Sequence, residues 1–222
     1  MMERNSLGFL QHYDNPLMDK IQYKSDGSCT VYFKDGSIKD HFIDCETVFN
    51  HQYGIPASKD GKLLFVGSWE KGLTAYDTVT GEKKWKYRPG SNRNIFVYSD
   101  FLVMCRGNRA LVKLDLLTGE VLWEQKSGTL EHIYRLDDRY IYAETLRGKH
   151  CVLDVTTMEV VKKYPPKTVN PSNCLSHVIR EACLQDGRLF IEGFENYPNR
   201  NYRDSCQSNV YREIDPDFYA MA

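Results

Sequence analysis

The sequence carries almost no net charge and has no long apolar segment. Its 29 Lys and Arg residues are balanced by 30 Asp and Glu residues, which gives a formal net charge of -1 over 222 residues. This balance excludes the overall basic bias of a protein that coats nucleic acid, so any charge signal must be local. No stretch approaches the about 18 consecutive apolar residues that a membrane-spanning helix needs, and no signal-peptide core follows the first residues. We therefore expect a soluble, cytoplasmic protein without a membrane partner.

Motifs for disulfides, metals and nucleotides are also absent or incomplete. The seven cysteines are scattered and odd in number, which is typical of reduced thiols rather than a disulfide framework. Cys174-x-x-His177 has a zinc-like spacing, but Cys183 and Cys206 do not form the second close pair that structural zinc sites usually have. No glycine-rich phosphate loop follows a strand and opens a helix. We therefore predict neither a metal site nor a bound cofactor.

The sequence is instead rich in aromatic residues and contains an internal repeat. The 15 Tyr, 10 Phe and 3 Trp residues, in a chain long enough to bury a large core, favour a β-rich fold. Three segments share the repeat: 75–85 (AYDTVTGEKKW), 113–123 (KLDLLTGEVLW) and, more faintly, 152–162 (VLDVTTMEVVK). Their aspartates Asp77, Asp115 and Asp154 follow one another after 38 and then 39 residues. A fixed period of this length indicates stacked structural repeats.

A second set of aspartates recurs in the same phase, each before an apolar run. These are Asp60, Asp100, Asp138 and Asp186. Each unit then consists of four short apolar runs separated by turns, which predicts a four-stranded antiparallel meander. The Asp-Gly and Thr-Gly turns suit positive φ values, and an aspartate four residues before the glycine can accept hydrogen bonds from turn amides.

These units predict an all-β fold, a small β-propeller of about five blades, each a four-stranded antiparallel meander. The expected units are residues 20–45, 55–88, 95–126, 132–164 and 178–215. We expect a single propeller domain over residues 19–217, with residues 1–18 as an N-terminal extension. The alternative is an open or sandwich-like all-β meander, because the first and last units are the least regular.

The motif Ala75-x-Asp77-x-x-Thr80-Gly81-x-x-x-Trp85 resembles the repeat of the pyrroloquinoline-quinone-type propeller family, which also occurs in outer-membrane assembly lipoproteins. In that family the tryptophan docks one blade on the next. The resemblance therefore implies structural roles for Trp85 and Trp123, and it is weakest at 152–162, where Met158 replaces the glycine and Lys162 the tryptophan. Many quinone enzymes of the family have adjacent cysteines and a calcium site, which this sequence lacks. We therefore expect the repeat to serve as a scaffold without a quinone.

The long connections between the expected strands form a candidate binding face. In an antiparallel meander these connections lie at one end of the strands, and the short Asp-Gly and Thr-Gly turns lie at the other. The long connections contain ten basic and five acidic residues, against 19 basic and 25 acidic residues in the remainder. Such a basic face would attract an anionic partner, although arginines are also common in solvated loops.

The polar segment 195–204 (ENYPNRNYRD) is the strongest candidate for a contact loop, because Tyr and Arg are enriched at binding hot spots. Its alternative role is that of a hairpin tip without a partner, and Trp69 could pack between blades instead of binding. The predicted partner-binding residues are Trp69, Arg88, Arg93, Arg106, Arg109, Arg147, Tyr197, Arg200, Tyr202 and Arg203.

No residue set specifies an enzyme. Cys105 or Cys151 could act with His132 or His150 as nucleophile and base, but alternation within the expected strands favours buried thiols. We predict no catalytic residues and a non-enzymatic, monomeric protein that binds a protein partner. A narrower hypothesis is a bacterial immunity or antitoxin-like protein that neutralises a toxin.

Two other classes remain as alternatives. One is an anionic-ligand or nucleic-acid binder, which is less favoured. The other is a hydrolase or lyase with its site at the mouth of the propeller channel. The candidate participants in such a reaction are His51, His132, Arg93 and Arg147.

Overall fold

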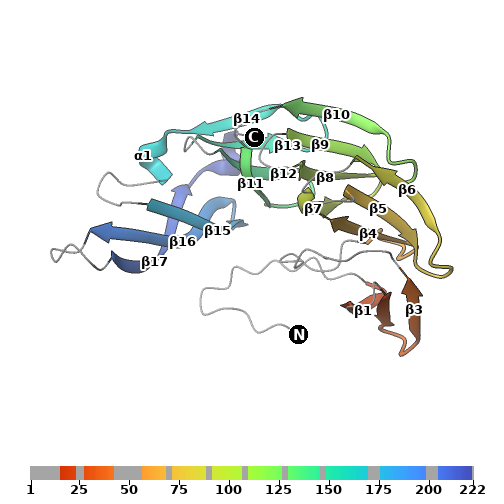
Figure 1. Cartoon of the computed structure of the whole chain (residues 1–222). Coiled ribbons are helices and arrows are strands. Elements are labelled where there is room, and N and C mark those ends of the chain that lie inside the picture. The colour runs from red at the N-terminus through yellow and green to blue at the C-terminus, as the bar shows by residue number, and fades with distance from the viewer. Residues whose placement is uncertain are drawn as a thin grey trace. The chain divides into compact units, whose positions relative to one another are not determined.

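The computed structural model describes most of the chain as strands that belong to two compact units (Figure 1). The described residues are 16–23, 28–42, 57–68, 72–88, 92–106, 110–126, 130–145, 149–169, 176–198 and 205–221. The N-terminal unit lies within residues 12–131, and the C-terminal unit contains residues 132–222.

The N-terminal unit contains three antiparallel sheets. Its strands are β1 (Met18–Tyr23), β2 (Ser28–Phe33), β3 (Ile38–Phe42), β4 (Leu63–Ser68), β5 (Gly72–Asp77), β6 (Lys83–Tyr87), β7 (Asn92–Val97), β8 (Phe101–Arg106), β9 (Ala110–Asp115) and β10 (Val121–Lys126). Strands β1–β3 and β4–β6 form two three-stranded sheets, and β7–β10 form a four-stranded sheet. Ala57 adds an isolated bridge to Leu64 on β4, where the sequence predicts the first strand of that unit.

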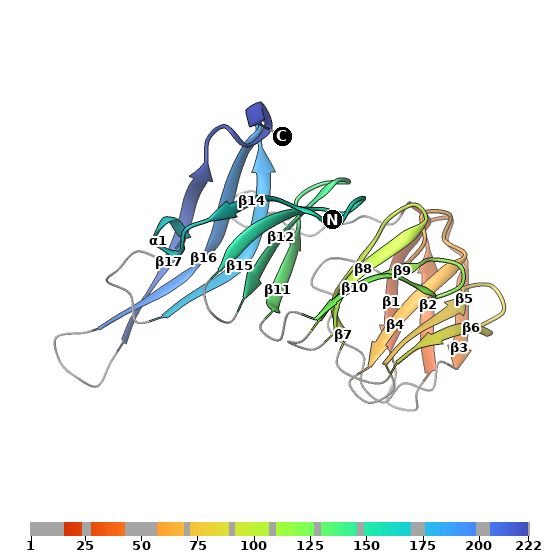
Figure 2. The ribbon, with the colours of Figure 1, turned by 90° about the horizontal axis from the view of Figure 1, so that it is seen from above.

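The C-terminal unit contains two further antiparallel sheets. Its elements are β11 (Leu130–Arg135), β12 (Tyr140–Thr145), β13 (His150–Asp154), β14 (Val160–Tyr164), α1 (Pro166–Val169), β15 (Ser176–Gln185), β16 (Arg188–Pro198), β17 (Ser205–Asp215) and the 3-10 helix η1 (Phe218–Met221). Strands β11–β14 form a four-stranded sheet, and the longer strands β15–β17 lie side by side in a three-stranded sheet (Figure 2).

Every sheet pairs strands that are neighbours in the sequence, so the predicted all-β meander fold is confirmed. The predicted four strands occur in two of the sheets, and the other three sheets have three strands each among the described residues. The Asp-x-x-Thr-Gly motif forms the predicted turn. Oδ1 of Asp77 accepts hydrogen bonds from the backbone N–H groups of Val79 and Thr80, both at 2.9 Å. The bond from the Thr80 N–H is the main reason why the pKa of Asp77 lies below its usual value. Asp115 and Asp154 make the equivalent pairs of bonds.

The residue after each turn has a left-handed backbone. Gly81 and Gly119 have φ values of 76° and 73°, and Met158 takes the same region with φ 61°. Glycine reaches this region without the steric cost that a Cβ atom brings. Met158 is therefore a costly replacement in the third copy of the motif.

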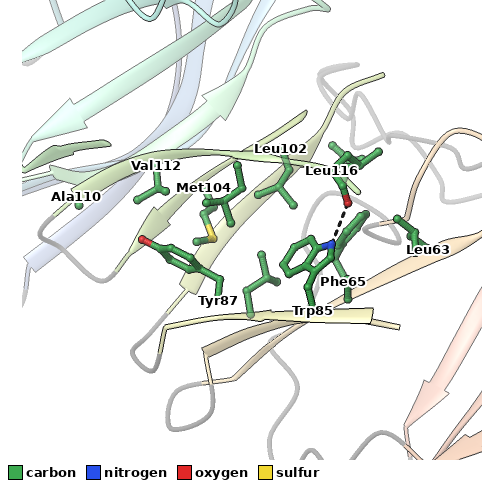
Figure 3. Packing of buried hydrophobic residues seen from close by; sticks show 13 residues of the cluster. Leu63, Phe65, Trp85, Tyr87, Leu102, Met104, Ala110, Val112 and Leu116 are labelled. Carbon is green, nitrogen blue, oxygen red and sulfur yellow. Dashed lines mark hydrogen bonds between the residues drawn. The ribbon is translucent and has the colours of Figure 1, made fainter. Parts of the chain in front are cut away.

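Trp85 joins two sheets of the N-terminal unit (Figure 3). The side chain lies on β6, and its indole Nε1 donates a hydrogen bond of 3.1 Å to the carbonyl of Leu116, which follows β9. The ring also covers Gly119 so closely that a Cβ atom there would be 2.6 Å from the indole. This geometry confirms the docking role that the family resemblance implies for Trp85. Trp123 on β10 is half-buried, and its docking role stays a prediction.

The C-terminal unit uses a polar contact at the corresponding position. Lys162 on β14 replaces the tryptophan, and its Nζ lies 2.5 Å from Oδ2 of Asp215 on β17. The Tyr164 hydroxyl donates to the same oxygen at 2.6 Å. Burial acts to raise the pKa of Asp215, but the bonds from Lys162 and Tyr164 outweigh burial and hold the pKa below its usual value.

Candidate partner-binding site

Two of the predicted partner-binding residues, Arg88 and Arg106, have side chains that the structure describes. Arg93 and Tyr197 lie in β7 and β16, where the backbone is described. The other predicted residues, Trp69, Arg109, Arg147, Arg200, Tyr202 and Arg203, lie outside the described residues.

Arg88 and Arg106 converge on one carboxylate at one end of the N-terminal unit. Arg88 follows β6, Arg106 ends β8, and Glu124 lies on β10. Nη2 of Arg106 lies 2.8 Å from Oε1 of Glu124, and Nη1 of Arg88 lies 3.9 Å from Oε2. The Glu124 and Arg106 side chains are largely enclosed, whereas that of Arg88 is 59% exposed.

Tyr87 adds a buried hydroxyl group to this cluster. Its side chain is 4% exposed, and its hydroxyl has no hydrogen-bond partner among the described residues. Figure 3 shows this hydroxyl pointing away from Trp85, on the side where Ala110 begins β9. Burial raises the pKa of Tyr87, and the nearby Arg106 guanidinium opposes this shift. The hydroxyl therefore stays protonated near neutral pH and can donate a hydrogen bond.

The four residues Tyr87, Arg88, Arg106 and Glu124 are called the arginine cluster below. Glu124 was absent from the sequence-based count of loop charges because it lies inside a strand. With two guanidinium groups and one carboxylate, the cluster keeps one surplus positive charge. Arg88 and Arg106 thus lie together, and Glu124 offsets part of the positive charge that the loop residues alone indicate.

The predicted contact loop 195–204 is shorter than the sequence suggested. Strand β16 continues to Pro198, which pairs with Ser205 at the start of β17. The prediction that Glu195 to Pro198 form a loop was therefore wrong. Backbone hydrogen bonds between β16 and β17 extend this hairpin. The residues of the extension are mostly polar, so they lack the alternation of apolar and polar residues from which a strand is predicted.

A partly buried ion pair anchors this hairpin. Glu195 is 1% exposed, and Arg212 on β17 donates from Nη2 to Oε1 of Glu195 at 2.9 Å. Arg212 also donates from Nη1 to the carbonyl of Val169, at the end of α1, at 2.6 Å. The hairpin is thus tied to α1 as well as to its own sheet.

Cys151 does not form a nucleophile–base pair with its neighbour His150. Cys105 is fully buried, and burial raises the pKa of the Cys151 thiol. His150 and Cys151 are consecutive on β13, so their side chains point to opposite faces of the sheet. The His150 Nδ1 instead lies 2.9 Å from the Tyr142 hydroxyl.

His132 has its ring against that of Tyr134, with 6.2 Å between the centroids. His51 and Cys174 lie outside the described residues, as does Arg147, and only the backbone is described for His177 and Cys206. No group of three or more His, Cys, Asp or Glu side chains that could hold a metal ion occurs among the described residues.

A pair of opposed carboxylates on the C-terminal unit was not predicted from the sequence. Glu181 on β15 pairs directly with Glu192 on β16, and both are 9% exposed. Burial, with a smaller contribution from Glu192, raises the pKa of Glu181 to about 8. The same surroundings raise the pKa of the neighbouring Cys183 to about 12, mainly through burial. A bulge between Ile179 and Glu181 sets this register, and the sequence does not reveal bulges.

None of the helices that the structure describes has the length and apolarity to cross a membrane. The fold and its repeat place the chain in the class of β-propeller repeat proteins. Residues 38–192 match the family model described as "Outer membrane protein assembly factor BamB", which covers more than half of the chain. The chain therefore belongs to this family of pyrroloquinoline-quinone-type repeats, and the predicted resemblance is confirmed.

Among solved structures, the chain is similar to BamB from Moraxella catarrhalis. The TM-score is 0.60 and the sequence identity is 17%, over 87% of this chain and 61% of that chain. At this identity the likeness shows the fold alone, and the chain spans less than two thirds of the length of that structure. No curated protein matches the sequence.

Proposed function

We propose that this chain is a non-enzymatic, protein-binding β-propeller of five blades. The observation that carries the proposal is the long β16–β17 hairpin. Both strands have 11 residues, whereas the strands of the other four sheets have five or six. The extra length continues beyond the Glu195–Arg212 ion pair that anchors the hairpin. A polar extension whose strands pair as far as Pro198 and Ser205 supports a role in recognition, because this part of its backbone is already ordered before a partner binds.

The residues of the extension are suited to protein contacts. The segment from Tyr197 to Arg203 contains two tyrosines and two arginines. These residue types combine a large contact area with planar hydrogen bonding, and they are common at hot spots. The family description, which names an assembly factor, supports the same class of function.

A pull-down from the native host tests this proposal. The full chain should capture a protein in stoichiometric amount, and the triple variant Tyr197→Ala, Tyr202→Ala, Arg203→Ala should lose it. The matched control is Arg188→Ala, at the opposite end of the same strand, where Arg188 pairs with Glu213 at 3.1 Å. Equal capture by the triple variant and the wild type would remove the hairpin from the proposal.

The finer parts of the proposal have separate tests. Five sheets support five blades, and small-angle scattering would test whether they close into one propeller. A bacterial toxin is the narrower choice of partner, and a toxin gene beside the gene of this protein would support it. Cell fractionation tests the proposed cytoplasmic location, and sedimentation tests the proposed monomer.

A further inference from the structure

We propose that the arginine cluster binds a carboxylate side chain of a protein partner, an inference that rests on the proposed protein-binding function. The cluster lies in the N-terminal unit, so it is a contact separate from the β16–β17 hairpin. The ligand group is an aspartate or glutamate side chain that bridges Arg88 and Arg106 and accepts a hydrogen bond from Tyr87.

The first argument is the unequal use of the two guanidinium groups. Arg106 makes a short, charge-assisted contact to Glu124 at 2.8 Å. Arg88 remains at 3.9 Å, beyond hydrogen-bond distance, and its side chain is 59% exposed. One carboxylate therefore fixes Arg106 and leaves most donors of Arg88 available for a second acceptor.

The second argument is the Tyr87 hydroxyl. A buried hydroxyl without an acceptor is unfavourable, and few such groups occur in folded proteins. The Arg106 guanidinium lies close to this enclosed hydroxyl but can only donate, so the proton of the Tyr87 hydroxyl has no acceptor among the described residues. Once the side chains that enclose the hydroxyl move aside, a partner's carboxylate oxygen would accept from Tyr87 and from a guanidinium group at the same time.

The charge of the cluster favours a single carboxylate over a nucleic-acid backbone. Its surplus of one positive charge is neutralised by one carboxylate. A chain of phosphates would bring further negative charges close to Glu124, whose side chain is only 15% exposed and is poorly screened. Arginine also matches the planar geometry of a carboxylate through two parallel hydrogen bonds.

Fluorescence anisotropy with a labelled, terminally blocked peptide that contains a single glutamate tests this proposal on the full chain. Arg88→Gln should weaken binding about tenfold, which is the loss expected for one charge-assisted contact. Tyr87→Phe keeps the packing of the ring and should weaken binding about threefold. The matched control Lys86→Gln removes a positive charge from the opposite, exposed face of β6 and should change binding by less than about twofold.

Glu124→Gln separates ligand binding from a purely structural role. In this proposal Glu124 competes with the incoming carboxylate, so its neutralisation should strengthen peptide binding about threefold. If the cluster only joined strands, this variant would lower the melting temperature and would not improve binding. Equal losses for Arg88→Gln and Lys86→Gln, or tighter binding of a labelled oligothymidylate than of the peptide, would overturn the proposal.

The same variants distinguish this inference from the proposed function. If the wild type captures a host protein and Arg88→Gln captures it equally well, the carboxylate site fails while the protein-binding function stands. If the peptide binds as expected and no host protein is captured, the site stands and the proposed function fails.

Discussion

The two units bury different chemistry. Counting Asp, Glu, His, Lys and Arg among the described residues, Lys113 is the one such side chain that is buried in the N-terminal unit. The C-terminal unit buries seven: Glu144, His150, Asp154, Glu181, Glu192, Glu195 and Asp215. The difference is clearest at the eighth residue after the motif aspartate, which is Trp85 in one unit and Lys162 in the other. The same repeat position therefore joins sheets by apolar packing in the first case and by an ion pair in the second.

The largest expected effect is that of Trp85→Ala. The substitution removes a large buried ring and its bond to Leu116, so the free energy of unfolding should fall by about 3–5 kcal/mol. Urea unfolding followed by far-UV circular dichroism measures this change. Trp123→Ala is the control, because its half-buried ring should cost clearly less. Equal losses would show that the Trp85 contact has no special role.

Asp215→Asn removes the ion pair with Lys162 and should lower the free energy of unfolding by about 2 kcal/mol, less than Trp85→Ala. Fully buried ion pairs cost more to break, but Lys162 is 25% exposed and can turn toward water. Hydrogen exchange of β14 and β17 amides measures the loss, with the exposed Asp217→Asn as control. Exchange that is unchanged in Asp215→Asn would mean that the ion pair does not stabilise this sheet contact.

Asp215 also makes the stability of the C-terminal unit depend on pH in the acidic range. The pKa of this carboxyl is lowered from 3.8 in the folded state, so its contribution is present above pH 3.8 and is lost as the pH falls through the folded value. In the wild type, amide hydrogen exchange in β14 and β17 should therefore increase more in strong acid than exchange in β6 and β9. The comparison is made after correction for the intrinsic effect of pH on exchange rates.

Gly119→Ala tests how much the close packing of the Trp85 ring on Gly119 contributes to stability. A Cβ atom at Gly119 would be 2.6 Å from the Trp85 ring, and the backbone there is left-handed. We expect a loss of about 2–3 kcal/mol in the free energy of unfolding, measured by urea. Gly36→Ala is the matched control, because Gly36 has φ 87° with nothing within 4 Å, and backbone strain alone should cost about 1 kcal/mol. If both substitutions lowered the free energy of unfolding equally, packing against Trp85 would not be the reason for a glycine at position 119.

The sequence predicted those features that depend on local residue types. The turn at Asp77 follows from residues within a motif of 11, because its hydrogen bonds lie inside that motif. The docking of Trp85 was implied by the resemblance of the same motif to a known repeat family, and the structure adds the close approach of Gly119 in the next copy. The fold class followed from the spacing of these motifs.

Features that depend on pairing between strands could not be predicted. Glu124 lies in a strand between Trp123 and Gln125, and nothing local shows that Arg106 and Arg88 reach it. The length of β16 beyond Phe194 depends on the ladder to β17, which polar sequence does not reveal. The arginine cluster was therefore predicted as separate loop residues, without its carboxylate and without Tyr87.

The smallest expected effect is that of Glu181→Gln, and it depends on pH. The pKa of Glu181 is raised from 4.5 to about 8 by burial and by Glu192, so the folded state retains a proton that the unfolded state loses. This contribution to stability is complete below pH 4.5 and is lost as the pH rises to about 8. Above that pH two charged carboxylates oppose each other across β15 and β16, which costs about 1 kcal/mol. Glu181→Gln should therefore be more stable than the wild type by about this amount in mild alkali and should show a flatter pH profile.

Thermal unfolding followed by circular dichroism over this pH range measures the effect, and tryptophan fluorescence provides the internal comparison. All three tryptophans, Trp69, Trp85 and Trp123, belong to the N-terminal unit, so their signal should not share the Glu181 profile if the two units unfold separately. Glu213→Gln, an exposed carboxylate on the same sheet, should leave the profile unchanged. A wild-type profile that is flat between pH 4.5 and 8 would show that Glu181 does not retain its proton in the folded state over this range. In that case the ion pair of Asp215 with Lys162 would be the remaining evidence that buried charged groups, and not apolar packing alone, determine the stability of the C-terminal unit.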